Sequence, residues 1–207
     1  MDTSAVGVHE LDLADWRERV ARLYLSDADL AGFRAGRDEL LRSHPQSPLP
    51  VEDRLGFAGL RYFPFDADAV VEAALTRTSG AGEPLSVDTG GPDGAIRYRR
   101  IGVAPTPYGS LTLFWLEAYG GGLFLPFRDG TCGHKSYGGG RYLTDTIKGT
   151  YGRGVVVSGN RVRLDFNYAY NPSCAYSSQW ACPLAPRENW LTEPIRAGEM
   201  AYVPTST

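Results

Sequence analysis

The chain has 207 residues, and a domain of this size buries about 70% of the surface of its unfolded chain. Its core therefore needs neither a disulfide framework nor a structural metal. The net charge of -3 and the pI near 5.6 argue against a nucleic-acid-binding protein, which would present a basic face to phosphates. No apolar run approaches the ~18 residues that a membrane-spanning helix requires.

The N-terminal residues 1–7 lack a basic region followed by an apolar one, so we expect a cytoplasmic protein. Three cysteines in a reducing compartment do not predict a disulfide framework. Cys174 and Cys182 could nevertheless form a pair under oxidising conditions.

Residues 10–43 follow a helical pattern. Two helix starts are indicated by Asp12 with Asp15 and by Ser26 with Asp29, and apolar side chains recur at helical spacing at Trp16, Val20 and Leu23. Prolines in residues 45–50 then favour an extended linker. We predict a helical hairpin in residues 1–45 that packs on a second domain, residues 46–207.

The rest of the chain has the pattern of short strands. The composition includes 25 glycines and 14 prolines, which is typical of many turns. Strands are expected at 60–65, 70–78, 96–103, 110–117, 122–127, 154–158, 161–167 and 200–203. The predicted fold class is mainly β (α+β): a small, closed antiparallel β-barrel with an N-terminal helical hairpin and an irregular C-terminal segment that crosses one end.

The alternation in residues 161–167 points to a candidate site. Val162, Leu164 and Phe166 would face the core, and Arg163, Asp165 and Asn167 would share the opposite face. We expect Asp165 and Asn167 to face an enclosed hollow at the mouth of the barrel, because small barrels hold single ligands there.

Several long motifs carry a family resemblance. They are Phe57-x-Gly59-Leu60-x-Tyr62-Phe63-Pro64, Phe127-x-Asp129-x-Thr131-x-Gly133, Ser136-Tyr137-Gly-Gly-Gly-Arg141, Leu164-Asp165-Phe166-Asn167, Ala169-Tyr170-Asn171-Pro172-x-Cys174-Ala175-Tyr176, Cys182-Pro183-Leu184-x-Pro186-x-x-Asn189 and Ile195-Arg196-Ala197-Gly198-Glu199. From about residue 44 the chain resembles the family called domain of unknown function 1684. The resemblance implies a compact, mainly β protein in which the C-terminal motifs form one polar patch, and it implies no activity. Cys132 and His134 do not belong to the family pattern.

The first functional hypothesis is a small-molecule enzyme, of hydrolase, cyclase or lyase type, acting in secondary metabolism. In it Cys174 attacks, His134 or Asp165 is the base, and an amide holds an oxyanion. The predicted catalytic residues are Asp165, Asn167, Cys174 and Tyr137, and the predicted substrate-binding residues are Thr131, Arg141, Asn171, Asn189, Tyr170 and Tyr176. No cofactor is expected, because Gly138–Gly140 matches no nucleotide-binding fingerprint.

Two other functions stay open. One is a non-catalytic protein that binds a small molecule in the same pocket. The other is a zinc protein using Cys132, His134, Cys174 and Cys182, although these residues lack the short ligand spacing of zinc knuckles; the main prediction contains no metal.

Several of these residues also have a purely structural interpretation. Both C-terminal thiols could be buried hydrophobes or a pair that pins the C-terminal segment. Asp129 and Glu199 are interpreted as structural ion-pair partners of arginines. The expected partner is a small-molecule ligand or substrate, with no nucleic acid and no membrane, and the sequence leaves a homodimer open.

Overall fold

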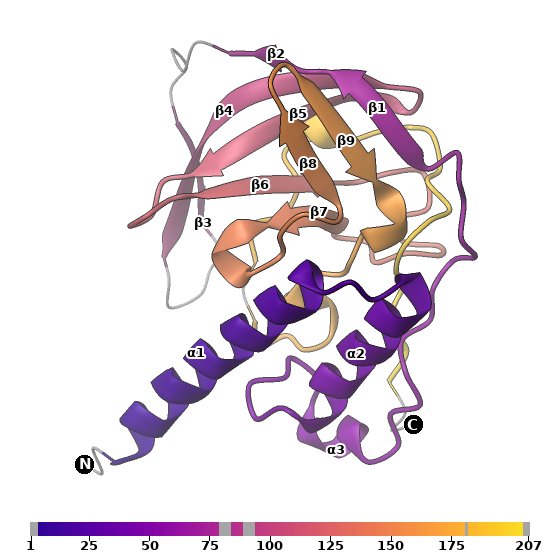
Figure 1. The fold of residues 1–207 in the computed structure, drawn as a ribbon. Coiled ribbons are helices and arrows are strands. Elements are labelled where there is room, and N and C mark those ends of the chain that lie inside the picture. The colour runs from indigo at the N-terminus through magenta and orange to yellow at the C-terminus, as the bar shows by residue number, and fades with distance from the viewer. Residues whose placement is uncertain (1–3, 79–83, 89–93, 181, 205–207) are drawn as a thin grey trace.

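The computed structural model describes residues 4–78, 84–88, 94–180 and 182–204 (Figure 1). The helices are α1 (Ser4–Leu25), α2 (Leu30–Ser43) and α3 (Val51–Arg54). The strands are β1 (Val70–Ala74), β2 (Thr76–Arg77), β3 (Leu85–Asp88), β4 (Ala95–Thr106), β5 (Gly109–Leu116), β6 (Gly122–Phe127), β7 (Arg141–Asp145), β8 (Val155–Ser158) and β9 (Arg161–Asp165).

The strands form two antiparallel sheets. One has the order β1-β9-β8, and the other has the order β2-β4-β5-β6-β7, with β3 also paired to β4. The prediction of a mainly β, antiparallel fold with a few helices is confirmed. The strand pairs of the described residues do not close the two sheets into a barrel.

The larger sheet is covered on both faces, and this explains its nearly continuous apolar sequence. In β6, Leu125 and Phe127 join the core between the two sheets, whereas Phe124 joins a second core against the helices. Adjacent β7 repeats the alternation, with Leu143 in the first core and Tyr142 in the second. The helices are therefore a third layer of the fold.

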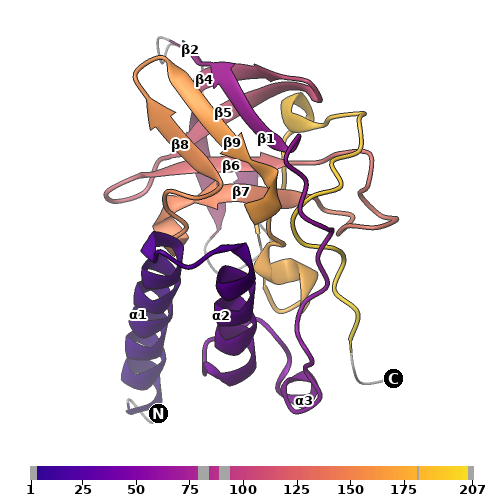
Figure 2. The ribbon, with the colours of Figure 1, turned by 45° about the vertical axis from the view of Figure 1, so that its right-hand side comes forward.

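The predicted helical hairpin is confirmed, with a longer first helix. α1 begins at Ser4 and not near Asp12, and α2 begins after Asp29, whose carboxylate accepts a 2.7 Å hydrogen bond from the Gly32 amide. Figures 1 and 2 show the two helices side by side beneath the β sheets. No helix of the described residues combines the length and apolar character needed to cross a membrane.

Two expected strands are replaced by extended chain. Residues 60–65 and 200–203 contain no strand, and one isolated bridge joins Tyr62 to Glu199. Proline accounts for part of the difference, because Pro64 and Pro204 have no amide hydrogen for a ladder. The hairpin predicted from Ser158 to Asn160 is confirmed as the β8–β9 turn, where Gly159 has a φ of 60°.

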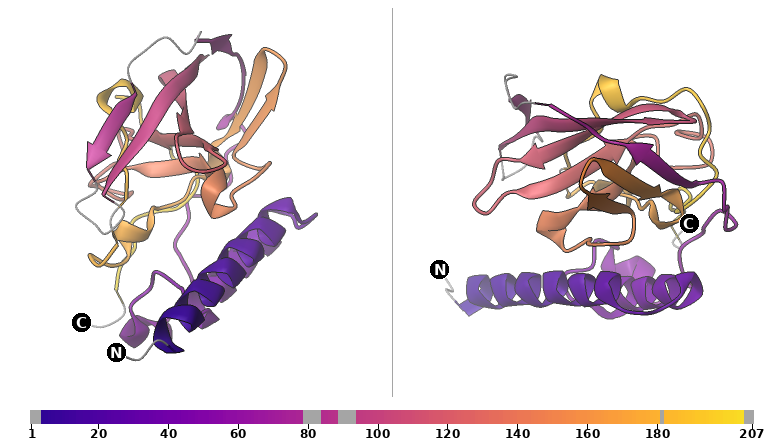
Figure 3. Two further views of the ribbon diagram at one scale, coloured as in Figure 1. Left: turned by 90° about the vertical axis from the view of Figure 1, so that its left-hand side faces the viewer. Right: turned by 45° about the horizontal axis from the view of Figure 1, so that its top comes forward.

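The C-terminal segment is irregular, as predicted, and runs past both sheets (Figures 2 and 3). Asn189 anchors it: its amide bonds the backbone N and O of Thr112 and the carbonyl of Pro126 at 2.8–2.9 Å. Arg141 anchors it further along, because its guanidinium donates to the carbonyls of Ile195, Ala197 and Glu199. Side chains of the sheet thereby replace the missing strand ladder. The proposed boundary after residue 45 stays a prediction.

Candidate functional site

A buried ion pair joins the helical hairpin to the C-terminal segment. The Arg37 Nε donates to Glu199 Oε1, and the side chains are 10% and 1% exposed. Glu199 Oε2 also accepts the Tyr176 hydroxyl at 2.9 Å and the Asn171 amide at 2.8 Å. Burial alone would lower the pKa of Arg37, but Glu199 raises this pKa well above its usual value. Both charges are thereby held in the protein interior.

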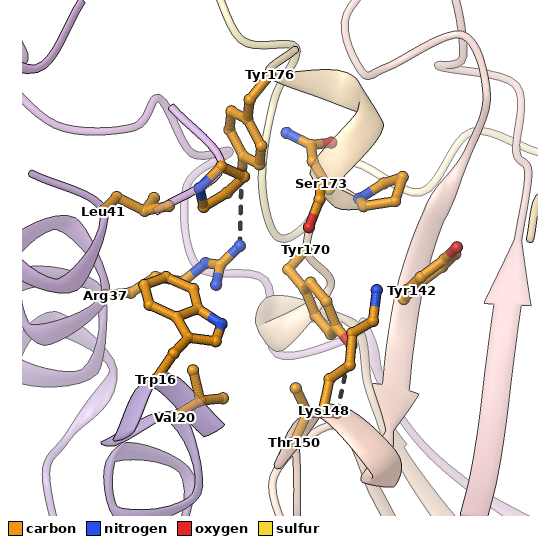
Figure 4. A pocket seen from close by; sticks show the side chains of 13 residues that line it. Trp16, Val20, Arg37, Leu41, Tyr142, Lys148, Thr150, Tyr170, Ser173 and Tyr176 are labelled. Carbon is orange, nitrogen blue, oxygen red and sulfur yellow. Dashed lines mark hydrogen bonds between the residues drawn. The ribbon is translucent and has the colours of Figure 1, made fainter. Parts of the chain in front are cut away.

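A small cavity lies next to this ion pair, between the helices and the β sheets. Its volume is about 50 Å³, and its walls comprise Trp16, Val20, Arg37, Leu41, Pro48, Tyr142, Lys148, Thr150, Tyr170, Asn171, Pro172, Ser173 and Tyr176. Figure 4 shows Lys148 and Tyr170 on one side facing Arg37, Trp16 and Val20 on the other. The Asn171 Oδ1 is buried without a hydrogen-bond partner among the described residues. A buried acceptor of this kind calls for a donor from water or a ligand.

Lys148 connects this inner cavity to a larger outer hollow. It lines both spaces, and the outer one has a volume of about 380 Å³. The outer walls are Arg17, Ala95, Ile96, Arg97, Leu116, Glu117, Ala118, Asp145, Ile147, Lys148 and Pro183. Lys148 is half-buried and forms no ion pair with any described residue. A cation that forms no ion pair with a described residue therefore lies between the two spaces.

Asp145 lines the outer hollow at the end of β7. It is 3% exposed, and its Oδ1 has no hydrogen-bond partner among the described residues. Burial raises the pKa of Asp145, whereas the charge of Lys148 and the amides of Lys148 and Ile147 act in the opposite direction. A carboxyl with a raised pKa beside an unpaired amine is typical of functional sites.

The predicted pair Asp165 and Asn167 does not share a pocket. β9 ends at Asp165, and Asn167 lies in the following 3₁₀ turn, so strand alternation stops between them. Asp165 Oδ1 accepts both nitrogens of Asn167, at 3.0 and 3.1 Å, and Oδ2 accepts Arg163 at 2.9 Å. Asn167 also bonds the backbone of Asp66 through its amide oxygen and nitrogen. Both side chains are thus engaged in holding the turn against the start of β1.

Of this pair, only Asp165 lines a wide hollow of about 400 Å³, which lies beside the turn that connects α1 and α2. The other residues of this hollow are Tyr24, Leu25, Ser26, Asp27, Ala28, Gly152, Arg153, Arg163 and Tyr168. Arg153 links α1 to the turn after β9, because it donates to the Tyr24 carbonyl at 2.9 Å and to the Tyr168 hydroxyl at 3.0 Å. The expected enclosed hollow shared by Asp165 and Asn167 under the C-terminal segment is not this one, because its lining includes neither Asn167 nor a residue of that segment.

The cysteines Cys174 and Cys182 are free and adjacent. The Cys174 amide donates to the Cys182 Sγ at 3.3 Å, and the Tyr137 hydroxyl lies 3.8 Å from the Cys174 Sγ. A hydrogen bond between the two thiols raises the pKa of Cys174 and lowers that of Cys182. Burial raises the pKa of Tyr137 to about 12. Cys174, the predicted nucleophile, is therefore the thiol that keeps its proton.

The zinc ligands considered from the sequence are not gathered. Within the ranges that the structure describes, no three His, Cys, Asp or Glu side chains are placed to hold a metal ion. His134 is exposed, while Cys132 contacts Asp129 and Ser136. The donor set expected for tetrahedral zinc is therefore divided between different places in the fold.

Three predicted substrate-binding residues have structural contacts. Arg141 is fully buried and paired with Asp129 at 3.1 Å, Thr131 donates to Asp129 at 2.9 Å, and Asn189 holds the C-terminal segment. The prediction that Asp129 and Glu199 are ion-pair partners of arginines is confirmed. Of the predicted binding residues, Tyr170, Asn171 and Tyr176 line the inner cavity.

Arg37 and Lys148 are two residues of the site that the sequence did not predict. Arg37 stands among the apolar residues of α2 and is 8% exposed, and a buried arginine at such a position signals a distant carboxylate. Lys148 follows β7 in a 3₁₀ turn, Thr146–Lys148, where no local pattern distinguishes it from a solvated residue.

The family comparison agrees with the motifs. The model of a protein family described as "Protein of unknown function (DUF1684)" matches residues 55–200, which include Asp145, Lys148, Asn171 and Glu199. The chain belongs to this family. Arg37 lies outside the matched range, on the N-terminal hairpin.

A solved structure shares the fold of this family member. It is the solution NMR structure of an uncharacterized protein of Haloarcula marismortui, with 37% sequence identity and a TM-score of 0.56. The alignment covers 83% of this chain and 91% of the archaeal one. The search of curated proteins gave no match.

The substitution Glu199→Gln tests the buried ion pair. We expect it to lower the free energy of unfolding by about 3–5 kcal/mol, because Arg37 would stay buried without its counter-charge. Urea denaturation measures the change. Glu39→Gln is the control, since Glu39 pairs with Arg42 at the surface and should change stability by less than about 1 kcal/mol. Equal effects of the two variants would contradict the assignment.

Asp145 should make stability depend on pH. The pKa of Asp145 in the folded protein lies above 3.8, the ordinary value that the carboxyl has in the unfolded chain. The native state therefore loses stability as the pH rises from 3.8 through this raised pKa. Asp145→Asn should therefore be more stable than the natural protein at neutral pH, and the difference should disappear on acidification below 3.8. Denaturation at several pH values measures it, and a variant less stable at neutral pH would contradict the expectation.

Proposed function

We propose that the protein binds a small anionic molecule in the inner cavity and outer hollow that meet at Lys148. The anionic group would pair with the Lys148 ammonium, and the body of the ligand would occupy the outer hollow. The single observation that supports the proposal most is the unpaired, half-buried charge of Lys148 at the junction. Holding a cation there without a partner costs stability, and binding an anion would offset this cost.

The walls favour a ligand with an apolar body. Ile96, Leu116 and Ile147 line the outer hollow, and its volume of about 380 Å³ is within the range of small-molecule pockets, which begins at about 300 Å³. Arg17, which also lines it, forms no ion pair with a described residue and adds a second positive charge.

The inner cavity favours a hydrogen-bond donor on the ligand. Asn171 uses its backbone amide on Glu199 and its side-chain nitrogen on the Met200 carbonyl, so its Oδ1 is left as an acceptor. Arg37 adds no net charge, because Glu199 neutralises it. The ligand class is therefore a small carboxylate, or a comparable anion, that also carries a hydroxyl or amide donor.

Calorimetry with three matched probes tests this proposal. We expect 4-hydroxybenzoate to bind more tightly than benzoate, which lacks the donor, and than 4-hydroxybenzamide, which lacks the charge. Lys148→Ala should weaken binding of 4-hydroxybenzoate by about tenfold or more, since a charge-assisted hydrogen bond contributes ~1.5–3 kcal/mol.

Lys135→Ala is the matched control, because Lys135 is the other lysine of the chain and is exposed. It should leave binding unchanged. Equal affinity for the charged and neutral probes, or equal loss in the two lysine variants, would contradict the proposal.

Catalysis is the second candidate, and the hollow beside Asp165 favours it. In this proposal the two sheets act as the walls of a small barrel, and Asp165 at its mouth takes a proton from a substrate without any cofactor. Asp165→Asn should then abolish turnover of an identified substrate while the variant stays folded. Retained turnover would remove Asp165 from the mechanism. Its carboxylate would then have a structural role, because Oδ1 and Oδ2 accept hydrogen bonds from Asn167 and Arg163.

A further inference from the structure

We propose that Cys174 and Cys182 form a peroxide-reactive dithiol, in which Cys182 is the attacking thiolate and Cys174 closes an intramolecular disulfide. This inference does not require a ligand at Lys148. Both cysteines are free and stand eight positions apart, with the Cys182 sulfur against the backbone of Cys174. Because the Cys174 amide lies 3.3 Å from the Cys182 Sγ, the two residues are already adjacent in the folded chain.

The surroundings distinguish the two sulfurs. Cys182 Sγ accepts the Cys174 amide at 3.3 Å and the Cys174 thiol, and these donors stabilise a negative charge on it. Lys148 contributes a positive charge that lowers the pKa of Cys182 further. Cys174 Sγ accepts a longer contact from the Tyr137 hydroxyl at 3.8 Å, and the neighbouring Cys182 and burial raise the pKa of Cys174. The arrangement therefore separates a nucleophile from a protonated resolving thiol.

Exposure allows a small oxidant to reach the pair. Cys182 keeps 8% of its surface exposed, and Cys174 is half-buried. Neither cysteine lines the inner cavity, the outer hollow or the hollow beside Asp165. A hydroperoxide that is only slightly larger than water fits this access.

The chemistry balances with hydroperoxide as the oxidant. The Cys182 thiolate attacks the terminal oxygen of ROOH, so an S–O bond forms, the O–O bond breaks, and the alkoxide leaves and takes a proton from solvent. The Cys174 sulfur then attacks the sulfenic sulfur, an S–S bond forms, and water leaves with the proton of Cys174. Two thiols are oxidised and one hydroperoxide is reduced to an alcohol and water.

Oxidation of the reduced full chain with equimolar hydrogen peroxide tests the proposal. We expect a monomer that has lost two hydrogens in its intact mass, and a peptide map that links Cys174 to Cys182 and leaves Cys132 reduced. Formation of disulfide-linked dimers, or oxidation of Cys132 ahead of the pair, would overturn it.

Serine variants identify the role of each sulfur. Cys182→Ser should react with peroxide at least about tenfold more slowly than the natural chain. The thiols that remain are ordinary ones, whose pKa near 8.5 leaves them mostly protonated at neutral pH. Cys174→Ser keeps a hydroxyl donor toward Cys182 and should accumulate a sulfenic acid that dimedone traps at Cys182. Cys132→Ser, the control, should form the disulfide at the natural rate.

A measurement on the natural chain guards against variants that fail to fold. Limited alkylation with iodoacetamide, followed by peptide mapping, should label Cys182 before Cys174 and Cys132. Labelling of Cys174 or Cys132 first would overturn the assignment of Cys182 as the attacking thiolate.

Discussion

The buried pair of Arg37 and Glu199 is the interaction on which the arrangement of this protein depends. Its two charges are separated by 162 positions in the chain, and their side chains are only 10% and 1% exposed. Each must therefore have the other, and this requirement fixes α2 against the C-terminal segment. Tyr176 and Asn171 complete the coordination of the carboxylate. The inner cavity exists because these polar groups, and not apolar side chains, meet at the boundary between helices and sheets.

The boundary between the helices and the sheets also explains why polar side chains lie on one face of the larger sheet. The face toward the smaller sheet is filled by aliphatic and aromatic side chains, which form the larger hydrophobic core. The face toward the helices contains tyrosines whose hydroxyls need partners, and it ends in irregular chain rather than in a strand. Tyr142 is an example: its ring lines the inner cavity and its hydroxyl donates to the Pro183 carbonyl at 2.6 Å, next to Cys182.

The elements that could be predicted from the sequence are the strands, turns and caps that neighbouring residues determine. The short runs of aromatic and branched residues at 110–117 and 122–127, bounded by turn residues, identify β5 and β6. The Ser158-Gly-Asn160 turn and the cap at Asp29 are likewise properties of adjacent residues. The candidate site is different. The partner of Arg37 cannot be inferred from its neighbours, and the 3₁₀ turn after Asp165 interrupts an alternation that looked regular. Lys148 is distinguished by the two hollows that it lines, and segments distant in the sequence form their walls.

The order of Arg37 and Glu199 along the chain has a consequence for biosynthesis. The ribosome produces α1 and α2 before the strands, and it produces Glu199, which neutralises Arg37, only after β9. Until Glu199 emerges, the guanidinium of Arg37 lacks this counter-ion, so the hairpin cannot dock stably on the growing sheets. Contacts this distant along a chain form slowly. Docking of the two helices therefore waits for the synthesis of Glu199, and until then the apolar face of the larger sheet lacks its helical cover.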